Sequence, residues 1–436
     1  METSKFQEKI RKQKAKIAVI GLGYVGLPLA LEFAKKGFSA IGVDLDVNKV
    51  NAINSGRSYI LDIKEEEVKP LVKRGLLKAT DDYSKLKDAD AIIICVPTPL
   101  RKTKDPDMSF IVSASEAIAK NLRKGQVIVL ESTTYPGTTE EVILPMLEAT
   151  GLKVGKDFNL GFSPERIDPG NPTYMTHNIP KVVSGQTKAC AENIILLYSQ
   201  IVGKVMPVSS VKVAEMVKLL ENTFRAVNIG LVNEIALMCD DLKIDVWEVI
   251  EAAKSKPFGF MPFYPGPGLG GHCIPIDPLY LSWKARVHGF EARFIDLASQ
   301  INSDMPDYVA DRVARALNRD GKAVNGSRIL IIGISYKRDV TDTRESPAFE
   351  VFHKLKERGA LIAYHDPFVP AVKLNGRTSR SVKLTSSAIK DKDCVLILTD
   401  HSNVDYQFIA ENAKFIFDTR NALRHIYTNR DKIERL

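Results

Sequence analysis

A cysteine preceded by two glycines is the most concentrated chemical feature of the chain. The segment Gly270–Cys273 reads Gly-Gly-His-Cys, and Asp277 follows four residues after the cysteine. The glycines leave room for a substrate to approach the sulfur, and the acid can lie one helical turn away. A lone cysteine is more often a small buried hydrophobe. The preceding loop, 257–271, favours a reactive site, because its many prolines, glycines and aromatic residues are unfavourable to order unless they shape a pocket.

A glycine-rich turn follows the first apolar run of the chain. Gly21-x-Gly23-x-x-Gly26 comes directly after Ile17–Ile20 and opens a helical stretch. Gly21 permits the tight turn, Gly23 lets the backbone approach a pyrophosphate, and Gly26 lets helix and strand pack closely. The second apolar run ends at Asp44, 23 residues after Gly21, near the spacing expected of an acid that binds the adenosine ribose. Asp44 would repel a 2′-phosphate, so we expect NAD rather than NADP; a tight turn without any nucleotide is the plainer alternative.

For several other polar residues, spacing alone allows either a functional role or an ordinary structural one. Lys218 and Asn222 are four apart on a predicted helix and share a face, and spacing alone favours an exposed polar stripe. Glu165 follows a predicted strand and is either a functional acid or an ordinary first-turn helix acid. Pro97-Thr98 and Ser132-Thr133 follow two further strands, at the edge where open α/β sheets bind ligands, although each is equally a simple turn.

Composition narrows the class of protein. The chain has 436 residues, 44% hydrophobic and 26% charged, which is typical of a globular protein of two or three domains. No apolar stretch approaches about 20 residues, so we predict no membrane span. Basic residues are interspersed with acids despite a net charge of +8, which argues against nucleic acid and for anionic small molecules as partners.

Two further features concern the cellular compartment and metals. The basic N-terminal segment lacks the apolar core of a secretory signal, so we expect a cytoplasmic protein. Five cysteines without CxxC spacing argue against a disulfide framework and against a zinc site. We therefore expect reduced thiols and no bound metal.

Alternating strand and helix patterns predict two doubly wound, Rossmann-like α/β domains joined by a long helix. Strands are predicted at Lys16–Ile20, Ser39–Val43, Ala91–Val96, Gln126–Leu130 and Asn159–Phe162, and again at Leu361–Tyr364, Cys394–Leu398 and Phe415–Phe417. The connecting helix runs over Val208–Leu242. The segment from Ser327 resembles the segment from Lys16 in outline. We divide the chain into a dinucleotide-binding domain, 1–207, a central helical region with the cysteine loop, 208–318, and a second Rossmann-like domain, 319–436.

Taken together, the motifs resemble the UDP-glucose/GDP-mannose dehydrogenase family over nearly the whole chain. The matching pieces, in order, are the turn Gly21–Gly26, Cys95-Val-Pro-Thr98-Pro, Ser132-Thr133, Ser163-Pro-Glu165, Lys218-x-x-x-Asn222, Gly270-Gly-His-Cys273-x-Pro-x-Asp277, and Tyr336-Lys337 with Asp342-x-Arg344-x-Ser-Pro. Within the family, the loop from Pro257 is most similar to UDP-N-acetylglucosamine 6-dehydrogenases. UDP-glucose enzymes typically have a lysine where this chain has Ile276, and an arginine where it has Pro257.

The resemblance implies a four-electron oxidation, in which a sugar C6 alcohol becomes a carboxylate while two NAD and one water are consumed. Asp277 would act as base through a water in the first oxidation, and Lys218 and Asn222 would stabilise the developing oxyanion. Cys273 would form a thiohemiacetal with the aldehyde and then a thioester. Glu165, with Thr133 positioning water, would be the base for thioester hydrolysis.

The same resemblance implies binding residues on both sides of the reaction, and no metal. Those for NAD are Gly21, Gly23, Tyr24, Val25, Gly26, Asp44, Lys49, Pro97, Thr98, Thr133 and Arg344. Those for the UDP-sugar substrate are Glu165, Arg166, Lys218, Asn222, Phe263, Tyr264, Gly266, Gly270 and Lys337. Lys337 would meet the UDP phosphates, although a solvated basic turn remains an alternative for Lys337 and Arg344.

Three interpretations of the whole protein stay open at this point. The leading one is a homodimeric UDP-N-acetylglucosamine 6-dehydrogenase of polysaccharide biosynthesis, with the long helix at the dimer interface. The second is a UDP-glucose or UDP-N-acetylmannosamine 6-dehydrogenase, because the core motifs are shared. The third, of another class, is a non-catalytic NAD-binding scaffold. The joint presence of Cys273, Lys218, Asn222 and Asp277 argues against the scaffold.

Overall fold

The structure is a computed structural model that describes residues 5–60, 63–101, 103, 105–167, 173–271, 273–374 and 376–436. His272 of the cysteine motif lies outside the described residues. The chain divides into two compact units, one of Met1–Glu221 with Trp283–Gly289 and the other of Asn222–Ser282 with Phe290–Leu436. Among the described residues, no helix is both long and apolar enough to cross a membrane.

The first unit is built on a sheet whose strands stand in the order β3-β2-β1-β4-β5-β6-β7-β8. The order of its first six strands is that of a dinucleotide-binding Rossmann sheet. The strands are β1 (Lys16–Ile20), β2 (Ser39–Val43), β3 (Leu77–Thr80), β4 (Ala91–Ile94), β5 (Val127–Leu130), β6 (Asn159–Phe162), β7 (Lys181–Gly185) and β8 (Val205–Pro207). The five strands predicted in this part of the sequence are confirmed, two of them with shorter bounds.

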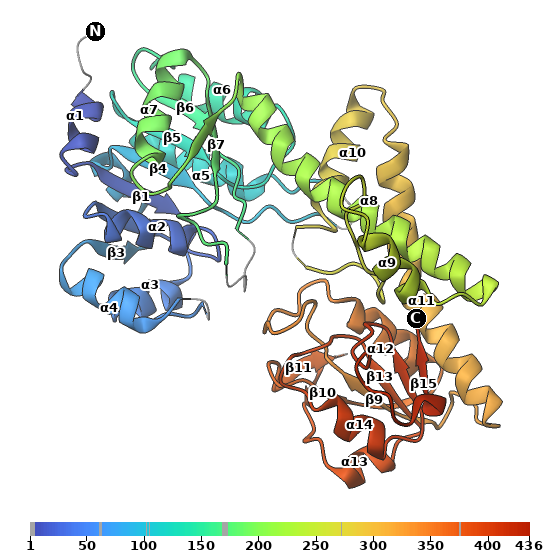
Figure 1. Cartoon of the computed structure of the whole chain (residues 1–436). Coiled ribbons are helices and arrows are strands. Elements are labelled where there is room, and N and C mark those ends of the chain that lie inside the picture. Colours follow the sequence, from blue (N-terminus) through green and yellow to red (C-terminus); the bar gives the residue numbers. More distant parts are fainter. Residues whose placement is uncertain are drawn as a thin grey trace. The chain divides into compact units, whose positions relative to one another are not determined.

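Helices cover both faces of this sheet (Figure 1). One face packs against α1 (Lys5–Arg11), α2 (Gly26–Lys35), α3 (Val47–Asn54), α4 (Glu65–Lys73) and α7 (Lys188–Tyr198). The other packs against the 3₁₀ helix η1 (Tyr83–Asp88), α5 (Ser109–Asn121), the π-helical turn η2 (Thr139–Ile143) and α6 (Leu144–Glu148). Alternation along β1 explains the two layers, because Ile17 and Val19 belong to the first cluster while Ala18 and Ile20 belong to the second.

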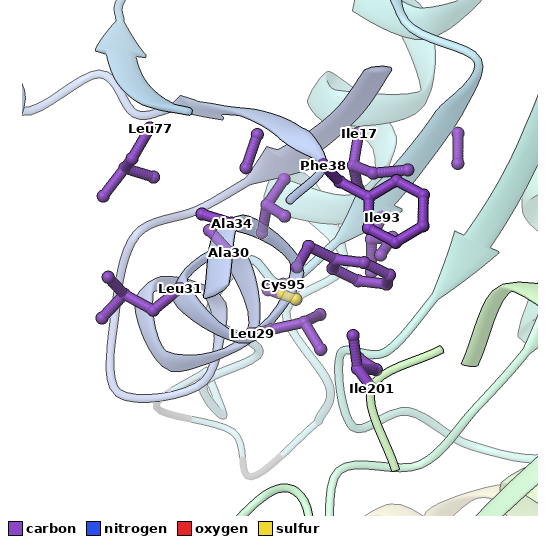
Figure 2. Packing of buried hydrophobic residues seen from close by; sticks show 14 of the residues in the cluster. Ile17, Leu29, Ala30, Leu31, Ala34, Phe38, Leu77, Ile93, Cys95 and Ile201 are labelled. Atoms are coloured by element: carbon purple, nitrogen blue, oxygen red, sulfur yellow. The ribbon is translucent and has the colours of Figure 1, made fainter. Parts of the chain in front are cut away.

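Side chains of α2 fill the first of these layers. Leu29, Ala30 and Ala34 pack with Ile17 of β1, and the sulfur of Cys95 lies in the same cluster (Figure 2). All five are buried. This packing fixes the start of α2, and with it the glycine turn, against the carboxyl end of β1.

One pairing in the sheet departs from the expected parallel arrangement. Strand β7 pairs with β6 in the antiparallel sense, with Phe162 opposite Ser184. The chain between them, 163–180, forms no helix in its described part, so it does not make the crossover that a parallel pair requires. Because β7 runs against β6, its first residue, Lys181, lies beside the carboxyl end of the parallel strands.

The long helix predicted over Val208–Leu242 is confirmed as α8 (Val211–Leu242). Large apolar side chains are exposed along one side of it, at Val213, Met216, Leu220, Phe224, Leu231, Met238 and Leu242. Their spacings of three, four and seven residues return them to one stripe of the helix, which we call the α8 stripe. After α8 come α9 (Val246–Lys254), α10 (Asp277–Val287) and α11 (Arg293–Arg319).

The second unit contains a five-stranded parallel sheet of order β10-β9-β13-β14-β15, another doubly wound order. Its strands are β9 (Arg328–Ile332), β10 (Leu361–His365), β13 (Cys394–Ile397), β14 (Ile416–Asp418) and β15 (Ile433–Arg435), with a separate hairpin of β11 (Ala371–Leu374) and β12 (Arg377–Arg380). The further helices are α12 (Pro347–Glu357), α13 (Ser386–Lys390), α14 (Tyr406–Asn412) and the 3₁₀ turn η3 (Arg430–Lys432). The predicted class of two doubly wound α/β domains is confirmed.

Candidate active site

The three glycines of the first turn meet different neighbours. A Cβ on Gly26 would lie 1.8 Å from the carbonyl oxygen of Gly21, and one on Gly21, whose φ is +90°, would lie 2.4 Å from the carbonyl oxygen of Cys95. A Cβ on Gly23 would meet nothing within 4 Å. The fold itself therefore explains Gly21 and Gly26, whereas Gly23 keeps open the space above the turn. Helix α2 starts there without a capping side chain, so its first N–H groups suit a phosphate.

Asp44 lies beside this turn, at the end of β2. Its Oδ2 accepts hydrogen bonds from the backbone N–H of Leu22, at 2.8 Å, and from Nζ of Lys49, at 3.0 Å. Its Oδ1 accepts from the N–H of Asp46 at 2.9 Å. The carboxylate is thus held in place where the second strand ends, as a ribose-binding acid requires. Lys49, also predicted to bind cofactor, is tied to Asp44 in this structure.

The ends of β4 and β5 are tied together next to the turn. The Ser132 hydroxyl donates to the carbonyl oxygen of Val96 at 2.8 Å. Around this link Thr98 is buried, Thr133 is partly exposed and Pro97 is exposed. Of the other predicted cofactor residues, Tyr24 is exposed and Val25 is partly buried at the start of α2, whereas Arg344 belongs to the second unit and pairs with Asp342 at 2.6 Å. The alternative of a solvated basic turn fits the exposed side chain of Arg344.

Glu165 follows β6 and sits in a buried ionic cluster that sequence reasoning missed. Its Oε2 accepts from Nζ of Lys181 at 2.9 Å, and the same nitrogen donates to Glu131 at 3.0 Å. The hydroxyl of Tyr198, on α7, donates to the other oxygen of Glu131. Lys181, the first residue of the apolar strand β7, is only 4% exposed. Lysine is rarely buried unless it is paired, so a lysine next to an apolar run was the signal in the sequence for this cluster.

Two other predicted site residues of the first unit are near Glu165. Arg166 is its neighbour in the sequence, and Lys218 is close enough in the fold for its charge to act on Glu165. Arg166 pairs with Glu221 at 2.6 Å and donates to the carbonyl oxygen of Pro180 at 2.7 Å. Lys218, on α8, is 8% exposed. Its positive charge also helps to hold down the pKa of Glu165. The exposed polar stripe that spacing alone favoured for Lys218 and Asn222 is wrong, because both side chains are buried.

Asn222, Cys273 and Asp277 come together in the second unit. The carbonyl oxygen of Cys273 accepts from the N–H of Asp277 at 2.8 Å, so the two residues lie one turn apart at the start of α10, as their spacing predicted. The side-chain amide of Asn222 donates to Asp277, and Arg225 donates to the amide oxygen of Asn222. Among the five cysteines, Cys273 alone is partly exposed and the others are buried.

The glycines of the loop 257–271 are explained by close packing within the second unit. A Cβ on Gly271, whose φ is +94°, would lie 2.8 Å from the ring of Tyr336, and one on Gly270 would lie 2.8 Å from the carbonyl oxygen of Glu345. A Cβ on Gly266 would lie 2.4 Å from the guanidinium of Arg420. The cysteine loop is therefore pressed against the loops at the carboxyl ends of β9 and β14.

A pocket opens where these loops meet. Its lining includes four predicted substrate residues, Tyr264, Gly266, Gly270 and Lys337. Arg420, which sequence reasoning missed, lines it as well, and burial lowers the pKa of this guanidinium to about 10, so it stays cationic at neutral pH. Two cations in one pocket suit a diphosphate. The available signal was position, because Arg420 follows β14 as Lys337 follows β9.

Buried polar contacts hold the loop that carries Lys337. Asp366 accepts from the N–H groups of Ile334 and Ser335, at 2.8 and 3.1 Å, and lies 3.0 Å from Nε2 of His401. The Ser335 hydroxyl donates to the carbonyl oxygen of Lys337 at 2.9 Å. Burial acts to raise the pKa of Asp366, but the hydrogen bonds from His401 and the backbone outweigh it, and the pKa lies below its usual value.

Two of the substrate predictions are aromatic residues. The ring of Tyr264 stacks on Trp247 with centroids 6.2 Å apart, and its hydroxyl donates to Glu251 at 2.7 Å. The ring of Phe263 packs edge-on against Phe224 of α8 at 5.7 Å. In the described part of the chain, no group of three or more His, Cys, Asp or Glu side chains could hold a metal ion.

Comparison with known proteins identifies the family. Its NAD binding domain matches residues 15–202, its central domain residues 212–304 and its UDP binding domain residues 330–425. The chain belongs to the UDP-glucose/GDP-mannose dehydrogenase family. It is therefore a nucleotide-sugar dehydrogenase that uses NAD and binds a UDP-sugar.

Relatives within the family carry the names of two amino sugars. The UDP-N-acetyl-D-glucosamine 6-dehydrogenase of Salmonella typhi is 37% identical over 390 residues, 89% of this chain and 90% of that protein. A UDP-N-acetyl-D-mannosamine dehydrogenase of Methanococcus maripaludis is 36% identical over 423 residues, 94% of this chain and 93% of that protein. The solved structure of UDP-D-ManNAc dehydrogenase from Pyrococcus horikoshii has a TM-score of 0.86 and 34% identity, and the match covers 93% of this chain and 96% of that one.

Proposed function

We propose that this dehydrogenase oxidises the C6 hydroxyl of UDP-N-acetylglucosamine to the carboxylate. The family membership supports the nucleotide-sugar reaction, and the Salmonella relative bears this activity in its name. The loop from Pro257 and Ile276 before the aspartate favour an N-acetylhexosamine over glucose. The observation that carries the chemistry is the Asn222–Asp277 contact one helical turn from a partly exposed cysteine.

The first oxidation requires a proton acceptor and an oxyanion partner. NAD, when bound, accepts the hydride that leaves C6 in each oxidation. Asp277 takes the hydroxyl proton through a water, and its side chain is oriented for this by the amide of Asn222. Lys218 and Asn222 stabilise the negative charge that develops on the sugar oxygen.

The second oxidation requires a carbon that can give up a hydride, which an aldehyde in its carbonyl form lacks. The thiolate of Cys273 adds to the aldehyde and forms a thiohemiacetal, whose oxidation gives a thioester. Glu165 then accepts a proton from the attacking water, which Thr133 positions. The carboxylate product and the free cysteine result.

The pocket of the second unit would hold the nucleotide end of the substrate. Lys337 and Arg420 would meet the diphosphate, and the buried contacts of Asp366 and His401 keep the loop of Lys337 in place. A cation that is already ordered loses less entropy on binding. This arrangement supports a UDP-sugar as substrate and agrees with the match to the UDP binding domain.

The test is the stoichiometry and the sugar preference of the purified enzyme. We expect two NADH for each UDP-N-acetylglucosamine consumed and no release of free aldehyde. In a panel with UDP-N-acetylmannosamine, UDP-N-acetylgalactosamine and UDP-glucose, kcat/KM for the N-acetylglucosamine form should exceed the others by more than tenfold, about 1.4 kcal/mol. One NADH per sugar would contradict the double oxidation.

UDP-N-acetylmannosamine is the second candidate, because the Methanococcus and Pyrococcus relatives carry that name. The same panel decides between the two sugars. A winning mannosamine form would replace the sugar while leaving the reaction intact. NAD binding without turnover on any sugar would instead favour the scaffold.

Replacing the nucleophile separates the two oxidations. Cys273→Ser should abolish formation of the acid, because the weakly acidic serine hydroxyl is a far poorer nucleophile than a thiolate. Product analysis by mass spectrometry should find no carboxylate. Cys239→Ser, at a buried cysteine of the same unit, is the control and should still form the acid. Acid formation by the Cys273 variant at a normal rate would exclude the proposed nucleophile.

A further inference from the structure

Lys181 connects two carboxylates that are both buried in the first unit. Its Nζ lies 2.9 Å from Glu165 and 3.0 Å from Glu131, and all three side chains are less than one-tenth exposed. The cluster draws on three strand ends and a helix, because Glu131 follows β5, Glu165 follows β6, Lys181 opens β7 and Tyr198 ends α7. Burying three charged groups is unfavourable unless their geometry satisfies each one, so this arrangement needs an explanation.

Glu165 alone is a poor proton acceptor in this setting. Its Oε1 accepts from the N–H groups of Arg166 and Ile167, both at 2.7 Å, while its Oε2 accepts from Lys181. Burial acts to raise the pKa of Glu165, but the charge and hydrogen bond of Lys181 outweigh it, and the pKa lies below its usual value. A base so strongly stabilised as an anion takes up a proton reluctantly.

The second carboxylate changes the charge balance around Glu165. With both acids ionised, the cluster of Glu131, Lys181 and Glu165 carries one net negative charge, and the uptake of one proton makes it neutral. A buried cluster loses its net charge in that step, which lowers the energy needed to accept a proton. Without Glu131, the pair of Lys181 and Glu165 is neutral, and protonation would leave a buried positive charge.

We propose that Glu131, Lys181 and Tyr198 form, together with Glu165, one buried proton-accepting cluster, and that ionised Glu131 is what enables Glu165 to take a proton during thioester hydrolysis. The proposal rests on the function proposed above for Glu165. Glu131 and Lys181 are positioning residues in it, since they act through Glu165.

The hydrolysis step balances as follows. The water oxygen attacks the carbonyl carbon of the thioester, one water proton passes to Glu165, and the C–S bond breaks with Cys273 leaving as thiolate. The second water proton stays on the new carboxyl group and then passes to the thiolate, which gives the carboxylate product and the free thiol. Lys181 then donates one proton to Glu131 while it takes the new proton from Glu165. The ammonium is unchanged, Glu131 is neutral, and Glu165 is ionised again.

Among the described residues, the titratable neighbours Tyr198, Cys95 and Lys218 fit this assignment. Burial raises the pKa of Glu131 to about 7, with the negative charge of Glu165 adding to the effect and Lys181 opposing it. Burial also raises the pKa of the Tyr198 phenol and of the Cys95 thiol, and the charge of Glu131 raises both further, so both stay neutral. Lys218 acts on Glu165 from α8. The cluster therefore gains its net negative charge as pH rises through about 7.

Glu131→Gln tests the proposal, because it keeps the shape and removes the charge. In the wild-type enzyme, hydrolysis should speed up as pH rises through about 7. In the variant, this rise should move toward acid by about one pH unit or more, and hydrolysis at pH 8 should slow by about tenfold or more. Stopped-flow should show a burst of two NADH per site before a slow steady state, and the intact protein should carry a thioester-linked sugar.

Tyr198→Phe should move the pH dependence of hydrolysis in the direction opposite to Glu131→Gln, because it acts on the ionisation of Glu131. The phenol donates to Glu131, so its loss makes ionised Glu131 less stable and should move the rise of hydrolysis toward alkaline pH. This variant alone decides the question if Glu131→Gln does not fold.

Asp90→Asn is the matched control. Asp90 is a buried acid held by Lys9 at 2.7 Å and Arg123 at 2.9 Å. It precedes β4, so it lies at the amino end of the strands, whereas Glu131 and Glu165 follow the carboxyl ends of β5 and β6. Its loss should lower stability without displacing the pH dependence. An unchanged pH dependence in both Glu131→Gln and Tyr198→Phe would overturn the proposal. If the wild type itself makes only one NADH per sugar, the proposed function has failed instead.

Discussion

Gly23 and Gly26 belong to the same turn, but the space around each predicts different effects of an alanine substitution on the free energy of unfolding. A Cβ on Gly26 would lie 1.8 Å from a backbone oxygen, which cannot move away without moving the turn. Gly26→Ala should therefore lower the free energy of unfolding by about 1–3 kcal/mol or more, measured by urea denaturation. Gly23→Ala should leave that free energy within about 0.5 kcal/mol, because nothing lies within 4 Å of the new Cβ.

The two variants should differ in cofactor binding as well. The added methyl at Gly23 fills the space where the pyrophosphate would approach the backbone, so KM for NAD should rise at least tenfold in a protein of normal stability. Gly203→Ala is a useful reference, since Gly203 has no positive φ, its new Cβ would meet only the carbonyl oxygen of His177 at 3.7 Å, and it lies far from the turn in the sequence. Normal NAD affinity in Gly23→Ala would remove the pyrophosphate from this turn.

The residues that sequence reasoning found and those it missed differ in how far apart they stand along the chain. Cys273 and Asp277 are four apart, so helical geometry alone placed them together. Glu131 and Lys181 are 50 residues apart, and they meet only because β7 returns antiparallel beside β6. A single sequence shows spacing within an element, but the contacts between distant elements depend on how the sheet is ordered.

At the scale of elements, apolar runs predicted the strands that are buried on both faces. Each residue of β4 and β5 is buried, which is why a continuous apolar run marks both strands. The edge strand β3 was missed because its sequence, Leu-Lys-Ala-Thr, alternates and is short. Strand β7 was missed because it starts with a lysine, the residue that serves the cluster.

The long helix α8 was the easiest element to predict, but its apolar pattern did not show which side of the helix is buried. Its apolar residues Val213, Leu220 and Phe224 belong to the exposed α8 stripe and not to a buried face. The buried side carries polar groups, among them Glu215, which accepts from the N–H groups of Gly137 and Thr139. The helical period of apolar residues identifies one face of a helix, but it does not say whether that face packs against the core or is exposed.

At the scale of the whole molecule, the α8 stripe supports the proposed homodimer. An exposed line of large apolar side chains along one helix is typical of an interface between subunits. Leu220→Asp with Leu231→Asp would place two charges in that line, and light scattering should then give the mass of a single chain, 48.4 kDa, where the wild type gives twice that value. The two positions are both exposed in the single chain, so its fold should survive.

Lys212→Ser provides the comparison for this prediction. Lys212 is exposed on α8 but lies outside the stripe, where its ion pair with Glu140 at 2.9 Å is also solvent-accessible. Because exposed ion pairs contribute about 0–1 kcal/mol, this variant should keep the wild-type mass. A wild-type protein that is already monomeric at micromolar concentration would contradict the dimer.

Helix α2 has Val25 at its N-cap position and no side-chain cap, unlike α3 and α7, which Asp46 and Thr187 cap. With the dinucleotide on this turn as proposed, its phosphates complete the helix that the chain leaves unfinished. A four-electron oxidation consumes two dinucleotides, so the end of α2 would be closed and opened twice for each sugar. The first turn of α2 would then gain and lose its phosphate partner in every catalytic cycle. The rest of the helix stays in place because Leu29 and Ala30 are packed in the core.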